Sequence, residues 1–201
     1  MAVISNTTTI IDAGAISVAT GAMTLIKTLT ASSSANLTFV HGTSGVVLDG
    51  TYKQYVFKFY NMHPAADDNN FEVNFRDGGS AYDATKTGTF LRATHAEASG
   101  TTAIANEAYT AAQATGNMIL CEAISNDADH GSSGSLTLFD PANTTFVKHL
   151  ICRSNSTHKN NITNDTLVDG YVNVTAAVDG VRFIMKEGNI DSGTIKMYGI
   201  K

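Results

Sequence analysis

Histidines are the residues of this sequence best suited to metal binding or proton transfer, so their spacing is the first test for chemistry. They are scattered along the chain, with no H-x-H pair and no H-E-x-x-H motif: His41, His63, His95, His130, His149 and His158. Zinc and iron sites normally draw on ligands at short, characteristic spacings. We therefore expect no metal and no cofactor.

One acidic segment has part of the pattern of a calcium loop. Asp127 and Asp129 alternate as the first ligands of such a loop do, but Gly131 lies one position too early. Leu138 stands where a bidentate Glu would be needed. The sequence favours a solvated hairpin turn here, and the same interpretation applies to the polar run 67–70.

No segment has the spacing of a catalytic motif. The run from His41 to Gly45 contains Ser44 but lacks the G-x-S-x-G spacing of a nucleophile elbow. No phosphate-binding glycine motif opens a predicted helix. We predict a protein that is not an enzyme and has no catalytic residues.

Two cysteines, Cys121 and Cys152, fall in different predicted strands. The segment Met1 to Thr20 has neither a basic region nor a continuous apolar region, so we expect no secretory signal and synthesis in a cytoplasm. Two buried thiols are therefore favoured over a disulfide.

The composition limits the class of partner. The net charge is −5, and Lys and Arg are not clustered, which argues against nucleic acid. No apolar run approaches the roughly 18 residues of a membrane span. Hydrophobic residues make up 43% of the chain and charged residues only 15%. This predicts a well-filled core beneath a weakly charged, hydroxyl-rich surface.

Alternation of apolar and polar residues dominates the chain and indicates strands. The clearest case is the segment 71–76. Phe71, Val73 and Phe75 are predicted to be buried on one face, and the other face is predicted to be exposed to water: Glu72, Asn74 and Arg76. The preceding segment 53–60 carries aromatic residues on both faces and is predicted to be a central strand. Turn residues lie between the two segments, which predicts a hairpin with a long loop.

Further strands are predicted at short intervals along the chain, at 23–30, 35–41, 117–124, 134–140, 145–153, 168–175, 181–186 and 194–198. The last two are expected to form a hairpin. Many short strands separated by turn residues favour an all-β, antiparallel two-sheet sandwich of the jelly-roll type over residues 21–201. Only 102–113 departs from this pattern, and it suits either a short surface helix or a long loop.

The first twenty residues mix isoleucine and valine with Thr, Ser, Ala and Gly. Two interpretations fit. The segment is an extended arm that docks on a neighbouring subunit by strand addition, through Val3, Ile4, Ile10 and Ile11. Alternatively, it is an ordinary first edge strand of the sandwich.

Four stretches resemble a family of virion structural proteins from marine tailed phages, including cyanophages: Thr24–Ser34, Leu48–Tyr55, Asn61–Pro64 and Gly188–Ile200. The likeness extends over nearly the whole chain, but its motifs are strand and turn signatures. The resemblance therefore implies an architecture and a setting, and no catalytic or binding residues.

The expected function is that of a non-enzymatic structural protein on the surface of a phage virion, as a capsid decoration or a tail or fibre accessory subunit. Its expected partners are other copies of itself, with a trimer favoured by the resemblance, and other virion proteins. The alternative is a module that binds carbohydrate on the host surface through its loops. A polysaccharide-cleaving enzyme ranks third, because no paired acidic residues can be assigned to a cleft.

Overall fold

The computed structural model of the 201-residue chain describes residues 3–5, 8–12, 15–16, 22–107 and 111–201. Every regular element in these ranges is a β-strand, and every strand pair is antiparallel. The predicted all-β class is confirmed. None of the described residues forms a helix that could cross a membrane.

The strands follow one another along the chain as β1 Val3–Ser5, β2 Thr8–Asp12, β3 Ala15–Ile16, β4 Met23–Ser34, β5 Leu37–Val40, β6 Gln54–Pro64, β7 Asn69–Arg76, β8 Lys86–Ala96, β9 Thr102–Asn106, β10 Met118–Ile124, β11 Ser132–Phe139, β12 Lys148–His158, β13 Ile162–Val172, β14 Gly180–Met185 and β15 Ile190–Ile200.

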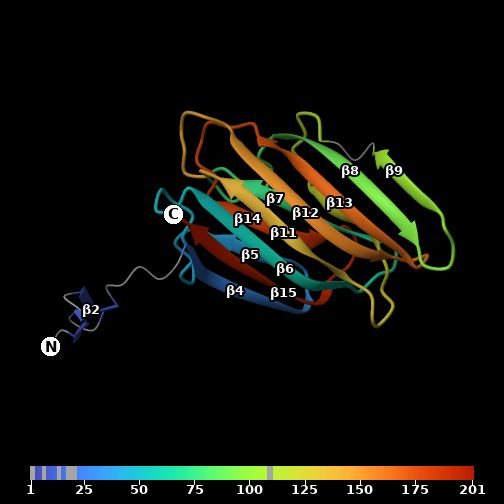
Figure 1. Ribbon diagram of the computed structural model, residues 1–201. Coiled ribbons are helices and arrows are strands. Elements are labelled where there is room, and N and C mark those ends of the chain that lie inside the picture. Colours follow the sequence, from blue (N-terminus) through green and yellow to red (C-terminus); the bar gives the residue numbers. More distant parts are fainter. Residues whose placement is uncertain (1–2, 6–7, 13–14, 17–21, 108–110) are drawn as a thin grey trace.

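Twelve of these strands belong to one sheet (Figure 1). Eight run side by side in the order β4-β15-β6-β11-β12-β13-β8-β9, and four in the order β10-β7-β14-β5. A single residue pair, Ile124 with His158, links β10 to β12 and so joins the two rows. At the other side, β4 leads directly into β5. The result is one nearly closed sheet, and the predicted division into two separate jelly-roll sheets is not confirmed.

Aromatic side chains fill the space between the two rows. Phe57 of β6 packs on Phe39 of β5 and on Phe183 of β14, with ring centroids 5.3 and 5.5 Å apart. Phe71 of β7 stacks on Phe183 at 5.7 Å. All four rings are fully buried. The predicted central place of β6 is confirmed, since it lies between β15 and β11.

The hairpins predicted for β6 with β7 and for β14 with β15 are wrong. β6 pairs with β11 and β15, whereas β7 pairs with β10 and β14. In the same way, β14 pairs with β5 and β7, whereas β15 pairs with β4 and β6. Each connection crosses from one row to the other. Alternation shows that a strand has a buried face, but strands on opposite sides of a core have the same alternation as neighbours within a sheet.

The second face of β7 was predicted to be wet, and this is wrong for Glu72 and Asn74, which are buried. Asn74 Nδ2 donates hydrogen bonds to the Thr115 carbonyl at 3.1 Å and to Asn117 Oδ1 at 3.0 Å. Asn117 Nδ2 in turn donates to Glu72 Oε2 at 2.9 Å. The loop before β10 thus covers this face, and burial raises the pKa of Glu72.

Two strands were not predicted. β9 occupies Thr102–Asn106, where a helix or a loop was expected, and residues 108–110 of that segment lie outside the described residues. β8 has its buried positions at Lys86, Gly88 and Phe90, of which only one is a large apolar residue. Its sequence therefore lacks the apolar alternation that marks a strand.

The N-terminal strands form a sheet of their own, in the order β1-β2-β3, which has no hydrogen-bonded pair with the twelve-stranded sheet among the described residues. Val3 lies opposite Ile11 and Ile4 opposite Thr9. Among the described residues, this segment contributes no strand to the larger sheet, and its docking on a neighbouring subunit stays a prediction. The side chains of Val3, Ile4, Ile10 and Ile11 lie outside the described part of the structure.

Candidate functional site

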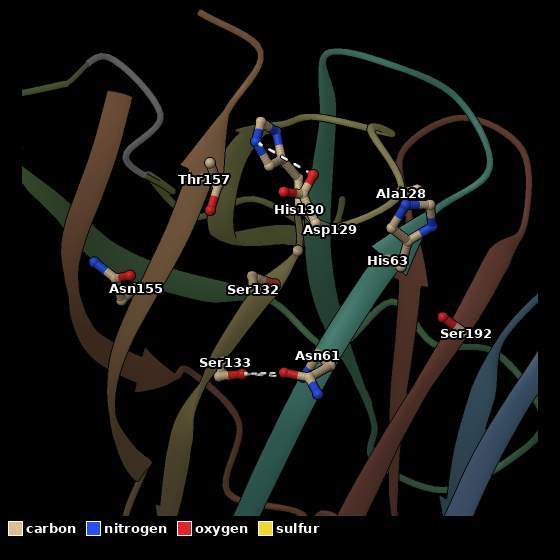
Figure 2. A pocket seen from close by; sticks show the side chains of 11 residues that line it. Asn61, His63, Ala128, Asp129, His130, Ser132, Ser133, Asn155, Thr157 and Ser192 are labelled. Carbon is tan, nitrogen blue, oxygen red and sulfur yellow. Dashed lines mark hydrogen bonds and ion pairs between the residues drawn. The ribbon is translucent and has the colours of Figure 1, made fainter. Parts of the chain in front are cut away.

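A polar hollow of about 450 Å³ opens where the ends of β6, β11, β12 and β15 meet the loop before β11 (Figure 2). Hydroxyl, amide and imidazole groups dominate its walls. The lining residues are Asn61, His63, Ala128, Asp129, His130, Gly131, Ser132, Ser133, Asn155, Thr157 and Ser192.

A bulge in β6 shapes one wall of the hollow. Asn61 has a positive φ of 48°, and the register between β6 and β11 shifts beside it. The Asn61 backbone N–H donates to Ser133 Oγ at 2.9 Å, which fixes the extra residue against β11. The kink places the polar side chain of Asn61 beside that of Ser133 (Figure 2).

The loop from Ser125 to Gly131 forms the opposite wall. The Asp127 N–H donates to Ser125 Oγ at 3.0 Å, and the His130 N–H donates to the Asp127 carbonyl at 2.9 Å. The Asp127 carboxylate lies 3.6 Å from His130 Nδ1. The segment is therefore a hydrogen-bonded turn, but the predicted hairpin is wrong, because the flanking strands β10 and β11 pair with other strands and not with each other. Among the described residues, no three His, Cys, Asp or Glu side chains gather in a group that could hold a metal ion.

Two imidazoles face the hollow and are largely buried, with side chains 15% (His63) and 14% (His130) exposed. His63 Nε2 lies 3.2 Å from the Asp127 carbonyl, and His63 Nδ1 lies 3.6 Å from an Asp191 carboxylate oxygen. His63 Nδ1, His130 Nδ1 and Ser132 Oγ are buried atoms without a hydrogen-bond partner in the described protein.

The three buried atoms have almost no accessible surface, so a ligand would bond instead to the polar groups that line the hollow. Most of these groups are neutral hydroxyls and amides, which can donate to and accept from the hydroxyl groups of a ligand. The hollow is therefore suited to a small, uncharged, polyhydroxylated molecule.

Most of these residues were missed in the sequence because they come from four strands and a loop that are far apart along the chain. Ser, Thr and Asn are also common throughout the sequence, so they carry no signal there. The one indication was the turn at 127–131, which was interpreted as solvated. His41, considered as part of a nucleophile motif, lies elsewhere, and its Nδ1 accepts a hydrogen bond from the Leu48 N–H at 3.1 Å.

The two cysteines are buried and free, as predicted. Burial raises the pKa of the Cys121 thiol to about 11 and that of Cys152 well above its usual value. Both are therefore thiols at neutral pH, and their position in the core gives them a packing role.

Two lysines are also completely buried. Lys86 Nζ donates to the Gly116 carbonyl at 2.6 Å, and Lys148 Nζ donates to the Val174 carbonyl at 2.9 Å. Burial disfavours the ammonium and lowers the pKa of both, that of Lys86 to about 8. Each side chain ties a loop to the end of a strand.

Comparison with known proteins finds no matching family model, no matching curated protein and no matching solved structure.

Proposed function

We propose that this protein is a non-enzymatic structural component of a tailed-phage virion, carried on the particle surface as a capsid decoration or as a tail or fibre accessory subunit. The observation that carries the proposal is that no strand pair among the described residues joins the small sheet β1-β2-β3 to the twelve-stranded sheet. A sheet of such short strands has little stability alone. Docking on another protein surface would supply it, which suits an attachment segment.

The composition supports the same role. A chain with 15% charged residues and a net charge of −5 has little self-repulsion, and so tolerates close packing beside other subunits. The proposed partners are further copies of the chain, with a trimer favoured by the sequence resemblance, and other virion proteins. On this proposal the chain is made in the cytoplasm of the host bacterium and ends in the virion.

Purified particles test the proposal directly. Peptide mass spectrometry of washed virions should detect the chain, and image reconstruction should assign density to it. Recombinant full-length protein should bind particles that lack it, whereas a chain without residues 1–20 should not. A Phe146→Lys variant, altered at an exposed loop position, is the control and should bind normally. Absence of the chain from washed virions would contradict the proposal.

The polar hollow favours a second candidate function, recognition of a host-surface carbohydrate. Its walls present the hydroxyl and amide groups of Asn61, Ser133, Asn155, Thr157 and Ser192. Asn155 Nδ2 donates to Thr163 Oγ1 and to the Asn164 carbonyl, which leaves the Asn155 amide oxygen available to accept a bond from a sugar hydroxyl. Neutral hydrogen-bonding groups of this kind recognise sugars without requiring charge.

A glycan array followed by calorimetry tests this second function. Asn155→Ala and Thr157→Val should each weaken binding of a retained sugar by up to about tenfold, the loss of roughly one hydrogen bond. Asn36→Ala, at the exposed turn between β4 and β5, is the matched control and should leave binding unchanged. Failure of the wild type to retain any sugar would exclude this function and leave the structural role untouched.

A further inference from the structure

β9 is an exposed edge of the twelve-stranded sheet. It pairs with β8 alone among the described strands, and Ile104 at its centre is 80% exposed. The pairing with β8 runs through all five residues without a bulge. The strand contains no Lys, no Pro and no other charged residue. Natural sheet edges usually carry such features to prevent pairing with other chains, so this edge is unprotected.

The hydrogen bonds to β8 show which backbone groups of β9 are free to pair. The Glu107 N–H donates to the Phe90 carbonyl at 3.0 Å, and the Ala96 N–H donates to the Thr101 carbonyl at 3.1 Å. Hydrogen-bonded pairs alternate along an antiparallel ladder. Ala103 and Ala105 therefore bond to β8, and Thr102, Ile104 and Asn106 direct their backbone N–H and C=O groups to the open edge.

An apolar stripe on the outer face of the sheet leads to this edge. Leu167 of β13 lies opposite Leu91 of β8, and Ile104 lies diagonally beside Leu91. Ile151 of β12 continues the stripe on the other side of Leu167. All four side chains are at least 40% exposed. On the same face, Arg153 opposite Leu167 is paired with Asp165, and Asp169 opposite Ile151 accepts a hydrogen bond from Thr89.

We propose that β9 joins two copies of this chain edge to edge, about a two-fold axis that passes midway between the Ile104 residues of the two copies. In this register Ile104 lies opposite Ile104 of the second copy, and Thr102 lies opposite Asn106 in both directions. Every outward backbone group of the strand then finds a partner. The axis is perpendicular to the sheet, so the two apolar stripes meet on one face and form a single stripe across both copies.

A second copy is the occupant that these features favour, because the strand complements itself. The register centred on Ile104 satisfies all three outward residues at once, the edge has no charge to repel its copy, and the stripe continues without interruption. The contact is isologous and closes after two copies. It is separate from any three-fold assembly, which would need another surface. Its area lies at or below about 1,200 Å², so a dimer that dissociates on dilution is expected.

Sedimentation of the full chain over micromolar to near-millimolar concentrations tests the proposal. The wild type should approach twice the monomer mass, and Ile104→Lys should weaken dimerisation at least about tenfold, because two ammonium groups would face each other across the axis. Phe146→Lys is the matched control: it places the same charge at an exposed apolar position, 69% accessible, outside the edge. It should dimerise as the wild type does, and thermal melts should show all three proteins folded.

A cysteine at the axis gives an independent test that does not depend on loss of binding. Residues opposite each other in a hydrogen-bonded antiparallel pair have Cα atoms about 5.5 Å apart, within reach of a disulfide. Ile104→Cys should therefore form a covalent dimer under mild oxidation. Phe146→Cys should not, because position 146 lies outside the edge. The two native cysteines are buried and should add no background cross-linking. The proposal is overturned if the wild type stays monomeric, if Ile104→Lys self-associates as well as the wild type, or if the two cysteine variants cross-link equally fast.

Discussion

At the scale of single residues, the core depends on aromatic rings that connect the two rows of strands. Phe57 is fully buried and contacts Phe39 and Phe183 from the opposite row. Removal of such a ring leaves a cavity that the neighbouring strands cannot close, because they are held by their own ladders.

We expect Phe57→Ala to lower the free energy of unfolding by about 3–5 kcal/mol, and Phe75→Ala to have an effect in the same range. Denaturant melts measure both. Phe146→Ala, at a position 69% exposed, should change stability by no more than about 0.5 kcal/mol. A loss under about 1 kcal/mol for Phe57→Ala would show that the ring does not join the two rows.

The buried Lys86 gives a pH dependence whose sign follows from its pKa. Burial lowers the pKa to about 8 in the folded protein, below the unfolded value of about 10.4. Between these values the unfolded chain binds more protons, so this group adds stability as the pH rises. Cys121 acts in the opposite direction, because its raised pKa of about 11 lets the unfolded thiol ionise first.

A comparison of variants isolates the lysine from the thiols. The wild type should gain stability relative to Lys86→Met as the pH rises from about 8 to about 10, in melts at a series of pH values. Lys201→Met, at the exposed end of the described chain, should show no such trend. A constant difference between the wild type and Lys86→Met would mean that Lys86 does not titrate in this range.

At the scale of elements, Gly193 in β15 lies where the register with β6 shifts, next to Ser192 of the polar hollow. It has a φ of 131°, and a Cβ there would lie 2.8 Å from Met62 Sδ and 2.9 Å from the Asn61 carbonyl oxygen. Only glycine fits both the dihedral angle and the close approach of β6.

Gly193→Ala should therefore lower the free energy of unfolding by about 1–3 kcal/mol. Gly50→Ala is the control, since Gly50 has no positive φ and a Cβ added to it would meet no atom within 4 Å, and its effect should be under about 1 kcal/mol. Equal stability of Gly193→Ala and the wild type in denaturant melts would show that β15 can move away from β6 at little cost.

The strands that the sequence predicted best are those with large apolar residues at every second position, such as β6 and β7. β8 was missed because Lys86 and Gly88 occupy two of its buried positions, and a buried lysine depends on carbonyl groups from a distant loop. Strand neighbours were mispredicted because the turn after β6 and the turn after β14 lead across the core. The polar hollow was missed because no short segment contains it.

At the scale of the whole molecule, the small N-terminal sheet and the large sheet share no strand pair in the part of the chain that the structure describes. Deletion of Met1 to Thr20 should leave the thermal midpoint of the large sheet nearly unchanged, because no strand pair is lost from it. Attachment or higher assembly should weaken. Thermal melts and light scattering on both proteins measure the two effects, and a truncated chain that fails to fold would show that the N-terminal strands complete the core.

The insertion of β15 between β4 and β6 has a consequence for how the chain reaches this structure. β4 and β6 lie early in the sequence, and neither has its shared neighbour until Ile190–Ile200 arrives. Pairings this distant in sequence slow folding, and during the wait two strand edges are open to other chains. For the same reason, a chain that lacks residues 190–200 should leave an open place between β4 and β6. A synthetic peptide of these residues should bind there and restore the sheet.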